Sequence, residues 1–151
     1  MKTTAIFTVL LLLVFVLGSC DKDGKQREED AGIIEEYIDE NGLEAQSTSS
    51  GLYYIIDEPG GNEHPKSGGS ISIKYTGWFI NGGEFDSSNG NKVTFQLNNL
   101  IEGWQEGIPL FGRGGKGTLL IPSHLAYGSQ GRGSIPPNAV LRFYIELIDF
   151  N

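Results

Sequence analysis

Several kinds of residue are scarce in this chain, and each scarcity narrows what the chain can do. Cys20 is the only cysteine, so no disulfide can form within the chain. The two histidines, His64 and His124, are isolated, and no group of Cys, His or carboxylate residues has the spacing of metal ligands. Basic residues form no cluster, so the chain lacks the electrostatic footprint of a nucleic acid binder. We therefore expect neither a metal site nor a nucleic acid partner.

The chain also lacks an apolar run long enough for a membrane span. Its longest apolar stretch extends from Ala5 to Leu17 and contains Thr8, whereas a spanning helix needs about 20 residues. Lys2 precedes this stretch and small residues follow it, which is typical of a secretory signal. We predict that residues 1–19 are a signal peptide that is removed.

The end of this segment contains the single cysteine. The residues Leu17-Gly18-Ser19-Cys20 resemble the lipobox of bacterial lipoproteins, in which the cysteine becomes the acylated first residue of the mature protein. The resemblance implies that a lipid on Cys20 anchors the chain to a membrane of the cell envelope, on its periplasmic side or at the cell surface. Each buried methylene of such a chain contributes about 0.8 kcal/mol to membrane affinity. The alternative is a plain signal peptide with an incidental cysteine.

Acidic residues are concentrated near the start of the mature chain. They outnumber basic residues between positions 21 and 58, whereas residues 59–151 contain as many of one sign as of the other. The sequence DKDGKQREED (21–30) has no apolar residue and predicts a flexible stalk. The following AGIIEEYIDENG (31–42) has apolar residues at helical spacing and predicts a helix of about three turns. We therefore interpret residues 20–49 as a lipidated acidic stalk with a short helix, whose apolar stripe docks on the domain or on a second copy.

From Leu52 onward the apolar residues recur with a period of two, which indicates β-strands. The candidate strands are 52–56, 71–79, 93–97, 118–121 and 141–147. Strands with one apolar face suit an antiparallel sheet whose other face meets water. The segment EGWQEGI (102–108) is the candidate to cover the apolar face, and Pro109 prevents its extension. We predict an α+β fold in which about five antiparallel strands wrap around one short helix, with Trp104 facing the sheet.

Four motifs carry a more specific resemblance. They are IKYTGWFINGGEFDSS (73–88), LIEGWQEGI (100–108), LLIPSHLAYG (119–128) and GSIPPNAVLRFYIELIDF (133–150). Their order and spacing resemble those of the FKBP family of peptidyl-prolyl cis/trans isomerases, over a domain of residues 50–151. The resemblance implies an FKBP-like half-open antiparallel β-sheet around a short helix, with an extra N-terminal helix. It also implies a shallow apolar pocket for a proline ring, overhung by the loop 128–137.

The resemblance further implies roles for individual residues. The catalytic candidates are Asp86, Tyr127, Phe85 and Phe143, and the substrate-binding candidates are Tyr75, Val93, Leu100, Ile101, Trp104 and Ile135. Trp104 is expected to form the pocket floor, the Ile101 backbone N–H to hold a substrate carbonyl, and the Tyr127 hydroxyl to donate to another. Asp86 is expected to orient the amide or to polarise its surroundings. On spacing alone, Tyr75 and Phe143 are ordinary core positions, and Asp86 is an ordinary loop residue.

This activity requires no cofactor, because no covalent bond is broken. Rotation about the peptide bond is opposed by about 18–20 kcal/mol, and a catalyst needs only to bind the twisted amide better than the planar one. The expected substrates are proline-containing unfolded or nascent polypeptides of the envelope. The alternative function is that of a proline-binding chaperone module of the same fold with little turnover.

The resemblance also bears on inhibitor binding and on the oligomeric state. Macrolide inhibitors are possible ligands, but Ser134 and Val93 make the pocket wall smaller or more polar than in many family members. The affinity for macrolides and the preference for the residue before proline therefore do not follow from the resemblance. The helix near Ile34 is much shorter than the dimerising arm of some relatives, which favours a monomer.

Overall fold

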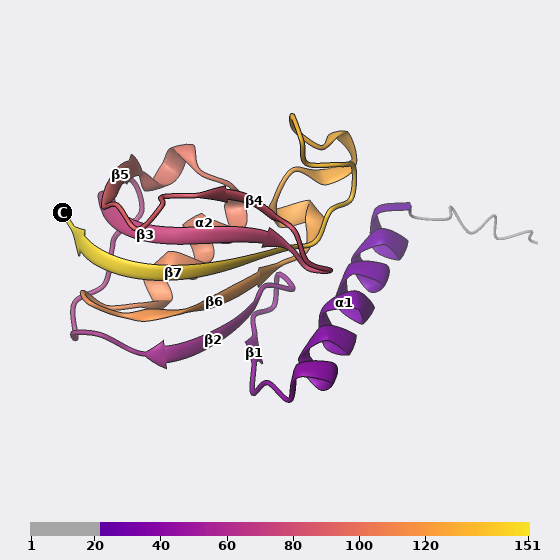
Figure 1. The fold of residues 1–151 in the computed structure, drawn as a ribbon, viewed down its shortest axis with the longest axis horizontal. Helices are drawn as coiled ribbons and strands as arrows, with labels where there is room; N and C mark the ends of the chain where they lie inside the picture. Colours follow the sequence, from indigo (N-terminus) through magenta and orange to yellow (C-terminus); the bar gives the residue numbers. More distant parts are fainter. Residues whose placement is uncertain (1–21) are drawn as a thin grey trace, which may run out of the picture.

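The computed structural model describes residues 22–151, and its main feature is an antiparallel sheet curled around a short helix (Figure 1). The α-helices are α1 (Lys22–Asn41) and α2 (Glu102–Gly107), and the strands are β1 (Gln46–Ser47), β2 (Tyr53–Glu58), β3 (Ser70–Phe79), β4 (Glu84–Ser87), β5 (Val93–Gln96), β6 (Lys116–Ile121) and β7 (Leu141–Phe150). The strand order is β1-β2-β6-β7-β3-β4, and β5 also pairs with β3. The predicted fold is confirmed, while the predicted signal peptide and Cys20 lie outside the described residues.

All five predicted strands are present, and two short ones were not predicted. β1 contains two residues and falls within a segment that the sequence presents as a polar linker. β4 contains four residues, of which only Phe85 is a large apolar residue. Neither strand has enough alternating residues to produce a visible period of two.

The long strand β3 pairs with three other strands. It pairs with β7 along one edge, and on its other edge it pairs first with β5 and then with β4. The register places Gly77 of β3 opposite both Asp86 of β4 and Phe143 of β7. Residues that are far apart in sequence therefore meet around the second half of β3.

The helix α2 lies unusually close to β6 because it presents two glycines to that strand. A Cβ atom on Gly103 would lie 2.5 Å from Cγ2 of Ile121, and one on Gly107 would lie 2.6 Å from Cδ1 of Leu119. Real Cβ atoms do not approach so closely, so any larger residue would push the helix outward. The two glycines that bracket Trp104 in the sequence thus set the distance between helix and sheet.

The sheet is buried on both faces near β6. Leu119 and Ile121 belong to the main core, whereas Leu120 joins a second cluster with Ile34 of α1 and with Val140. Ile34 and Leu120 are both fully buried. Helix α1 therefore docks on its own domain, across one end of the sheet (Figure 1).

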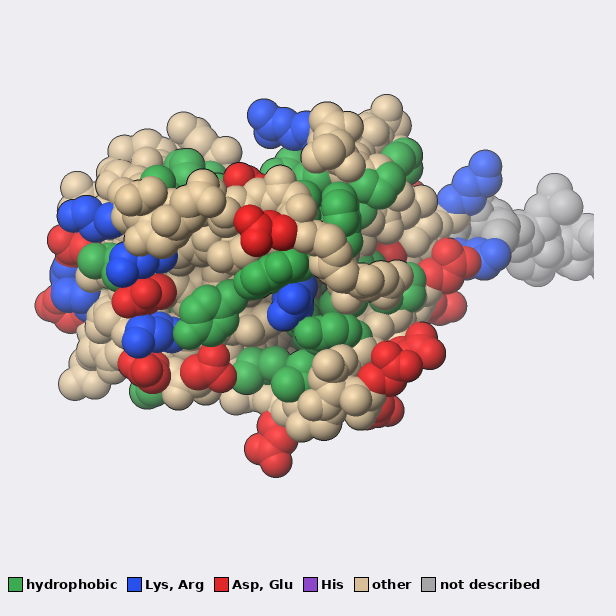
Figure 2. All heavy atoms as spheres, in the orientation of Figure 1, with side chains coloured by type: hydrophobic (Ala, Val, Ile, Leu, Met, Phe, Trp, Pro, Cys, Tyr) green, Lys and Arg blue, Asp and Glu red, His purple; other side chains and the backbone are tan. Residues whose placement is uncertain are grey.

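Helix α1 covers only one end of the sheet face that is seen in Figure 2. Hydrophobic side chains gather in the middle of this face, and charged side chains of both signs are interspersed around them. Tyr144 of β7 is the most exposed large hydrophobic residue of the sheet, at 38%. The mixed charges agree with the balance of acidic and basic residues over 59–151.

The N-terminal segment corrects one prediction from the sequence. Residues 22–30 were expected to be a flexible stalk, but the helix begins at Lys22 and includes them. The expectation was wrong because it considered only apolar residues, and residues 22–30 have none. Helices in proteins are stabilised mainly by tertiary contacts, and here one of those contacts is made by a carboxylate, which a hydrophobic pattern does not reveal.

That carboxylate belongs to Asp30, which is fully buried. Its Oδ2 accepts hydrogen bonds from the Ser123 backbone N–H at 2.8 Å and from the Ser123 hydroxyl at 2.6 Å. Its Oδ1 accepts a third from Gln26 Nε2 at 2.8 Å. A buried charge needs such partners to offset its lost hydration. Asp30 therefore joins α1 to the start of the segment that leads to Tyr127.

We expect Asp30→Ala to lower the free energy of unfolding by about 1–3 kcal/mol, because it leaves the buried Ser123 donors without an acceptor. Denaturant unfolding measures the loss, and faster hydrogen exchange of the Ser123 amide locates it. Glu36→Ala is the matched control, since Glu36 is an exposed carboxylate of the same helix. Equal stability of both variants would contradict the assignment.

Candidate functional site

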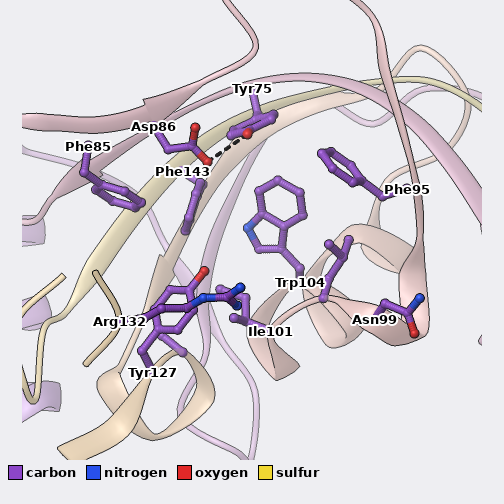
Figure 3. Close-up of a pocket in the computed structure, with 12 residues that line it drawn as sticks. Tyr75, Phe85, Asp86, Phe95, Asn99, Ile101, Trp104, Tyr127, Arg132 and Phe143 are labelled. Atoms are coloured by element: carbon purple, nitrogen blue, oxygen red, sulfur yellow. Dashed lines mark hydrogen bonds between the residues drawn. The ribbon is translucent and has the colours of Figure 1, made fainter. Parts of the chain in front are cut away.

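A cavity of about 390 Å³ opens between the sheet and α2 (Figure 3). Its lining consists of Tyr75, Phe85, Asp86, Phe95, Asn99, Leu100, Ile101, Trp104, Ala126, Tyr127, Arg132 and Phe143. The residues come from β3, β4, β5, the segment between β5 and α2, α2 itself, the segment after β6, and β7. A cavity of this size, lined by aromatic rings and a few polar groups, is typical of a site for a small ligand or a side chain.

Aromatic rings form the floor and walls of the cavity. The ring centroid of Trp104 lies 5.1 Å from that of Tyr75 and 5.0 Å from that of Phe143, both with edge-to-face geometry. Phe85 meets Phe143 in the same way, with centroids 5.5 Å apart. Trp104 is only 4% exposed. Such packing holds the rings in place and gives the cavity a fixed apolar surface.

The absence of a side chain at Gly77 makes this ring arrangement possible. A Cβ atom on Gly77 would lie 2.6 Å from Cε1 of Phe143 and 3.0 Å from Cζ of Phe85. Gly77 is buried between the two strands that carry these rings. The sequence motif contained this glycine, but its role becomes visible only in the strand register.

Asp86 has a defined partner inside the site. The Tyr75 hydroxyl donates a hydrogen bond to Asp86 Oδ2 at 2.8 Å (Figure 3). Burial raises the pKa of Tyr75, and the hydrogen bond to Asp86 raises that pKa further. Because a higher pKa favours the neutral phenol, Tyr75 remains a donor at neutral and mildly alkaline pH. The Asp86 carboxylate is thereby held in one orientation, with Oδ1 left available.

Three hydrogen-bond donors around the cavity have no partner among residues 22–151. The indole N–H of Trp104 is buried and unpaired, and Figure 3 shows its nitrogen facing the cavity. The Tyr127 hydroxyl points into the cavity in the same view. The Ile101 backbone N–H stands at the extended N-terminal cap of α2. Donors held in fixed positions around a cavity are suited to binding carbonyl oxygens of a peptide.

The structure brings most of the predicted site residues together. Tyr75, Phe85, Asp86, Leu100, Ile101, Trp104, Tyr127 and Phe143 all line the cavity. Val93 and Ile135 do not: Val93 is half-buried against the core, and Ile135 is buried within the core. The catalytic and binding roles assigned to these residues stay predictions.

Four lining residues were not predicted, namely Phe95, Asn99, Ala126 and Arg132. Phe95 shares a face of β5 with Val93, so the strand alternation was a signal that either residue reaches the cavity. Arg132 lies in the loop that the resemblance places over the pocket. No group of three or more Cys, His, Asp or Glu residues suited to a metal ion occurs in the described part of the chain.

The chain belongs to the FKBP-type peptidyl-prolyl cis-trans isomerase family, whose sequence pattern matches residues 61–148. Among individual relatives, it is similar to the FKBP-type isomerase FkpA of Aeromonas hydrophila, with 42% identity over 132 residues, covering 85% of this chain and 48% of the relative. FkpA of Escherichia coli strain K12 is 42% identical over 133 residues, covering 87% and 47%. The chain thus spans about half the length of these relatives.

Solved structures support the same grouping. The crystal structure of FkpA from Escherichia coli has a TM-score of 0.72 and 37% identity, covering 85% of this chain and 64% of that one. A peptidyl-prolyl cis-trans isomerase from Pseudomonas syringae has a TM-score of 0.74 and 27% identity, covering 89% and 99%. AtFKBP13 has a TM-score of 0.66 and 37% identity, covering 72% and 100%. The predicted family and fold are confirmed.

We expect Gly77→Ala to displace the Phe143 and Phe85 rings and to weaken binding of proline peptides by about tenfold, on the order of 1.4 kcal/mol. Titration of a proline peptide followed by NMR measures both the affinity and the aromatic chemical shifts. Gly83→Ala is the matched control, because its nearest neighbour would be 3.8 Å away. Unchanged ring shifts in Gly77→Ala would show that the strand register is not as described.

Proposed function

We propose that this chain accelerates cis/trans isomerisation of the peptide bond before proline. The observation that carries the proposal is the aromatic cavity with Trp104 as its floor, in a chain of the FKBP-type isomerase family. The cavity combines a rigid apolar surface with unpaired donors. It offers a proline ring a place to pack and offers the flanking carbonyls hydrogen bonds.

The chemistry requires the site to favour the twisted amide. The planar amide is stabilised by resonance, which opposes rotation by about 18–20 kcal/mol. Twisting removes this resonance and makes the carbonyl less strongly hydrated, so an apolar site disfavours the twisted form less than the planar one. The proline ring packs on Trp104 between Tyr75 and Phe143, and only the bond before it remains free to turn. Differential binding of this kind raises the rate without covalent chemistry.

The polar groups hold the substrate backbone while the bond rotates. The Ile101 N–H and the Tyr127 hydroxyl bind substrate carbonyls on either side of the proline. Asp86, oriented by its hydrogen bond from Tyr75, faces the amide and orients it or polarises its surroundings. Each tenfold gain in rate needs only about 1.4 kcal/mol of differential stabilisation, which is within the range of one or two such hydrogen bonds.

The proposal extends to the place where the protein works. We assign Cys20 as a lipidated first residue of the mature chain, on the strength of the Leu-Gly-Ser-Cys motif. Residues 22–151 contain no helix that is both long and apolar enough to cross a membrane. The substrates are then proline-containing polypeptides that fold in the cell envelope, and macrolides are possible ligands of the same cavity.

We expect the purified full chain to accelerate isomerisation of X-Pro peptides, and the double variant Tyr127→Phe with Asp86→Val to lose at least about tenfold in kcat/KM. Protease-free NMR exchange measures the rates. Tyr144→Phe with Asp57→Val is the matched control, since it removes the same groups from positions outside the cavity. A folded wild-type chain that binds proline peptides without accelerating them would support the proline-binding chaperone module instead.

We expect cells that express the full chain to attach labelled fatty acid to it, and Cys20→Ser to abolish the labelling, because no other thiol is present. Membrane fractionation should show the wild-type chain with the membranes and the variant released from them. Adding Ser129→Cys to Cys20→Ser restores a thiol at an exposed position and should not restore labelling. Labelling of Cys20→Ser at the wild-type level would refute the anchor.

A further inference from the structure

Arg132 is held by its backbone while its side chain stays unengaged by any opposite charge. The Arg132 N–H donates to the Ile135 carbonyl at 2.9 Å, and the Ile135 N–H donates back at 2.9 Å. Gly131 and Gly133 on either side have positive φ angles of 64° and 58°, which glycine adopts without strain. This tight hairpin fixes the point from which the long Arg132 side chain extends.

The guanidinium reaches from this hairpin to the mouth of the cavity. Its central carbon lies 5.9 Å from the centroid of the Tyr127 ring, and in Figure 3 the group lies beside Tyr127 and Ile101. Of the described residues that line the cavity, Arg132 is the one that carries a positive charge. It forms no ion pair with any residue of the described chain. A substrate therefore meets an arginine whose charge is unpaired.

The negative charge of the cavity lies on the opposite wall. Asp86 accepts the hydrogen bond of Tyr75, and Figure 3 shows both on the side of β3 and β4, away from Arg132. A bound peptide is thus placed between a negative wall and a positive wall. An acidic side chain is repelled by the first and attracted by the second, which favours one orientation next to the Ile101 and Tyr127 donors.

We propose that Arg132 makes the site prefer proline flanked by an acidic residue. The inference rests on the proposed function, since it concerns the substrates of the same cavity. The planar guanidinium offers a carboxylate two parallel hydrogen bonds, which an ammonium group does not. Because Arg132 is exposed, its charge is partly screened by water and the preference is modest. The preference also weakens as salt is added, since salt screens exposed charges.

The test compares peptides that differ only in charge. One pair has Glu or Gln immediately before proline, and the other has Glu or Gln immediately after it. For the wild-type full chain at low ionic strength, we expect kcat/KM and affinity to be about two- to fivefold higher for Glu than for Gln in at least one pair, in the range of exposed ion pairs. We expect Arg132→Gln to reduce this ratio to about one and Arg132→Lys to retain part of it.

The matched control is Lys66→Gln, which removes one positive charge at an exposed position outside the cavity lining. It should leave the Glu-to-Gln ratio unchanged. The proposal is overturned if the wild-type ratio is one or lower in both pairs. It is also overturned if Arg132→Gln lowers values for Glu and Gln peptides equally, because Arg132 would then only hold the Tyr127 ring in place.

The two proposals fail in different ways. Rates on the Gln peptides test the isomerase activity, because they do not depend on the Arg132 charge. The affinity ratio, measured by NMR titration of the same peptides, tests the acidic preference even for a chain that does not accelerate isomerisation. A preference for Glu in binding without turnover would therefore support the role of Arg132 and refute the enzyme.

Discussion

The close contact between α2 and β6 determines the geometry of the site. Two glycines one helical turn apart allow the helix to rest directly on Leu119 and Ile121, and Trp104 lies between them in the sequence. The indole is therefore carried on a helix that packs directly against the sheet. Because protein interiors are close-packed, the rings of Tyr75 and Phe143 stay in contact with Trp104. The cavity lies beside this contact, with Trp104, Tyr75 and Phe143 among its lining residues.

The polar groups of the site come from separate parts of the chain, and each is positioned by a neighbouring residue or element. Asp86 is fixed by Tyr75, the Ile101 N–H by the start of α2, and Tyr127 by the segment that follows Ser123. None of these groups depends on a long flexible loop for its position. A site whose donors are already in place loses little free energy to reorganisation when charge or bond order changes in a substrate.

The sequence was sufficient for the parts of the fold that repeat regularly. The period of two located β2, β3, β5, β6 and β7, because each of these strands has an apolar face. It missed β4, which holds Phe85 and Asp86, because four residues with one large apolar side chain have no period. The four motifs predicted most of the cavity lining through resemblance. They did not reveal that Gly77 makes room for the rings, since that follows from which strands lie opposite it.

The remaining differences between the sequence-based predictions and the structure have a common physical origin. Whether Val93 or Phe95 reaches the cavity depends on how far β5 runs along β3, and whether Ile135 or Arg132 faces it depends on the hairpin that joins them. Both are decided by contacts between distant residues. Residues 22–30 are also fixed by a contact with a distant residue. They were predicted to be a flexible stalk because their buried residue, Asp30, is polar. The spacing of apolar residues along the sequence indicates which side chains are buried, but it does not indicate buried hydrogen bonds.

The docking of α1 also bears on how far the domain can travel. The helix begins at Lys22, two positions after Cys20, and is attached to the domain through Asp30 and Ile34. If Cys20 carries a lipid, almost no free chain separates the membrane surface from the domain. The domain would then stay close to the lipid headgroups. Under the proposed function, such an arrangement would bring the cavity to polypeptides at that surface, and the effective concentration of the domain would be set by its two-dimensional density in the membrane.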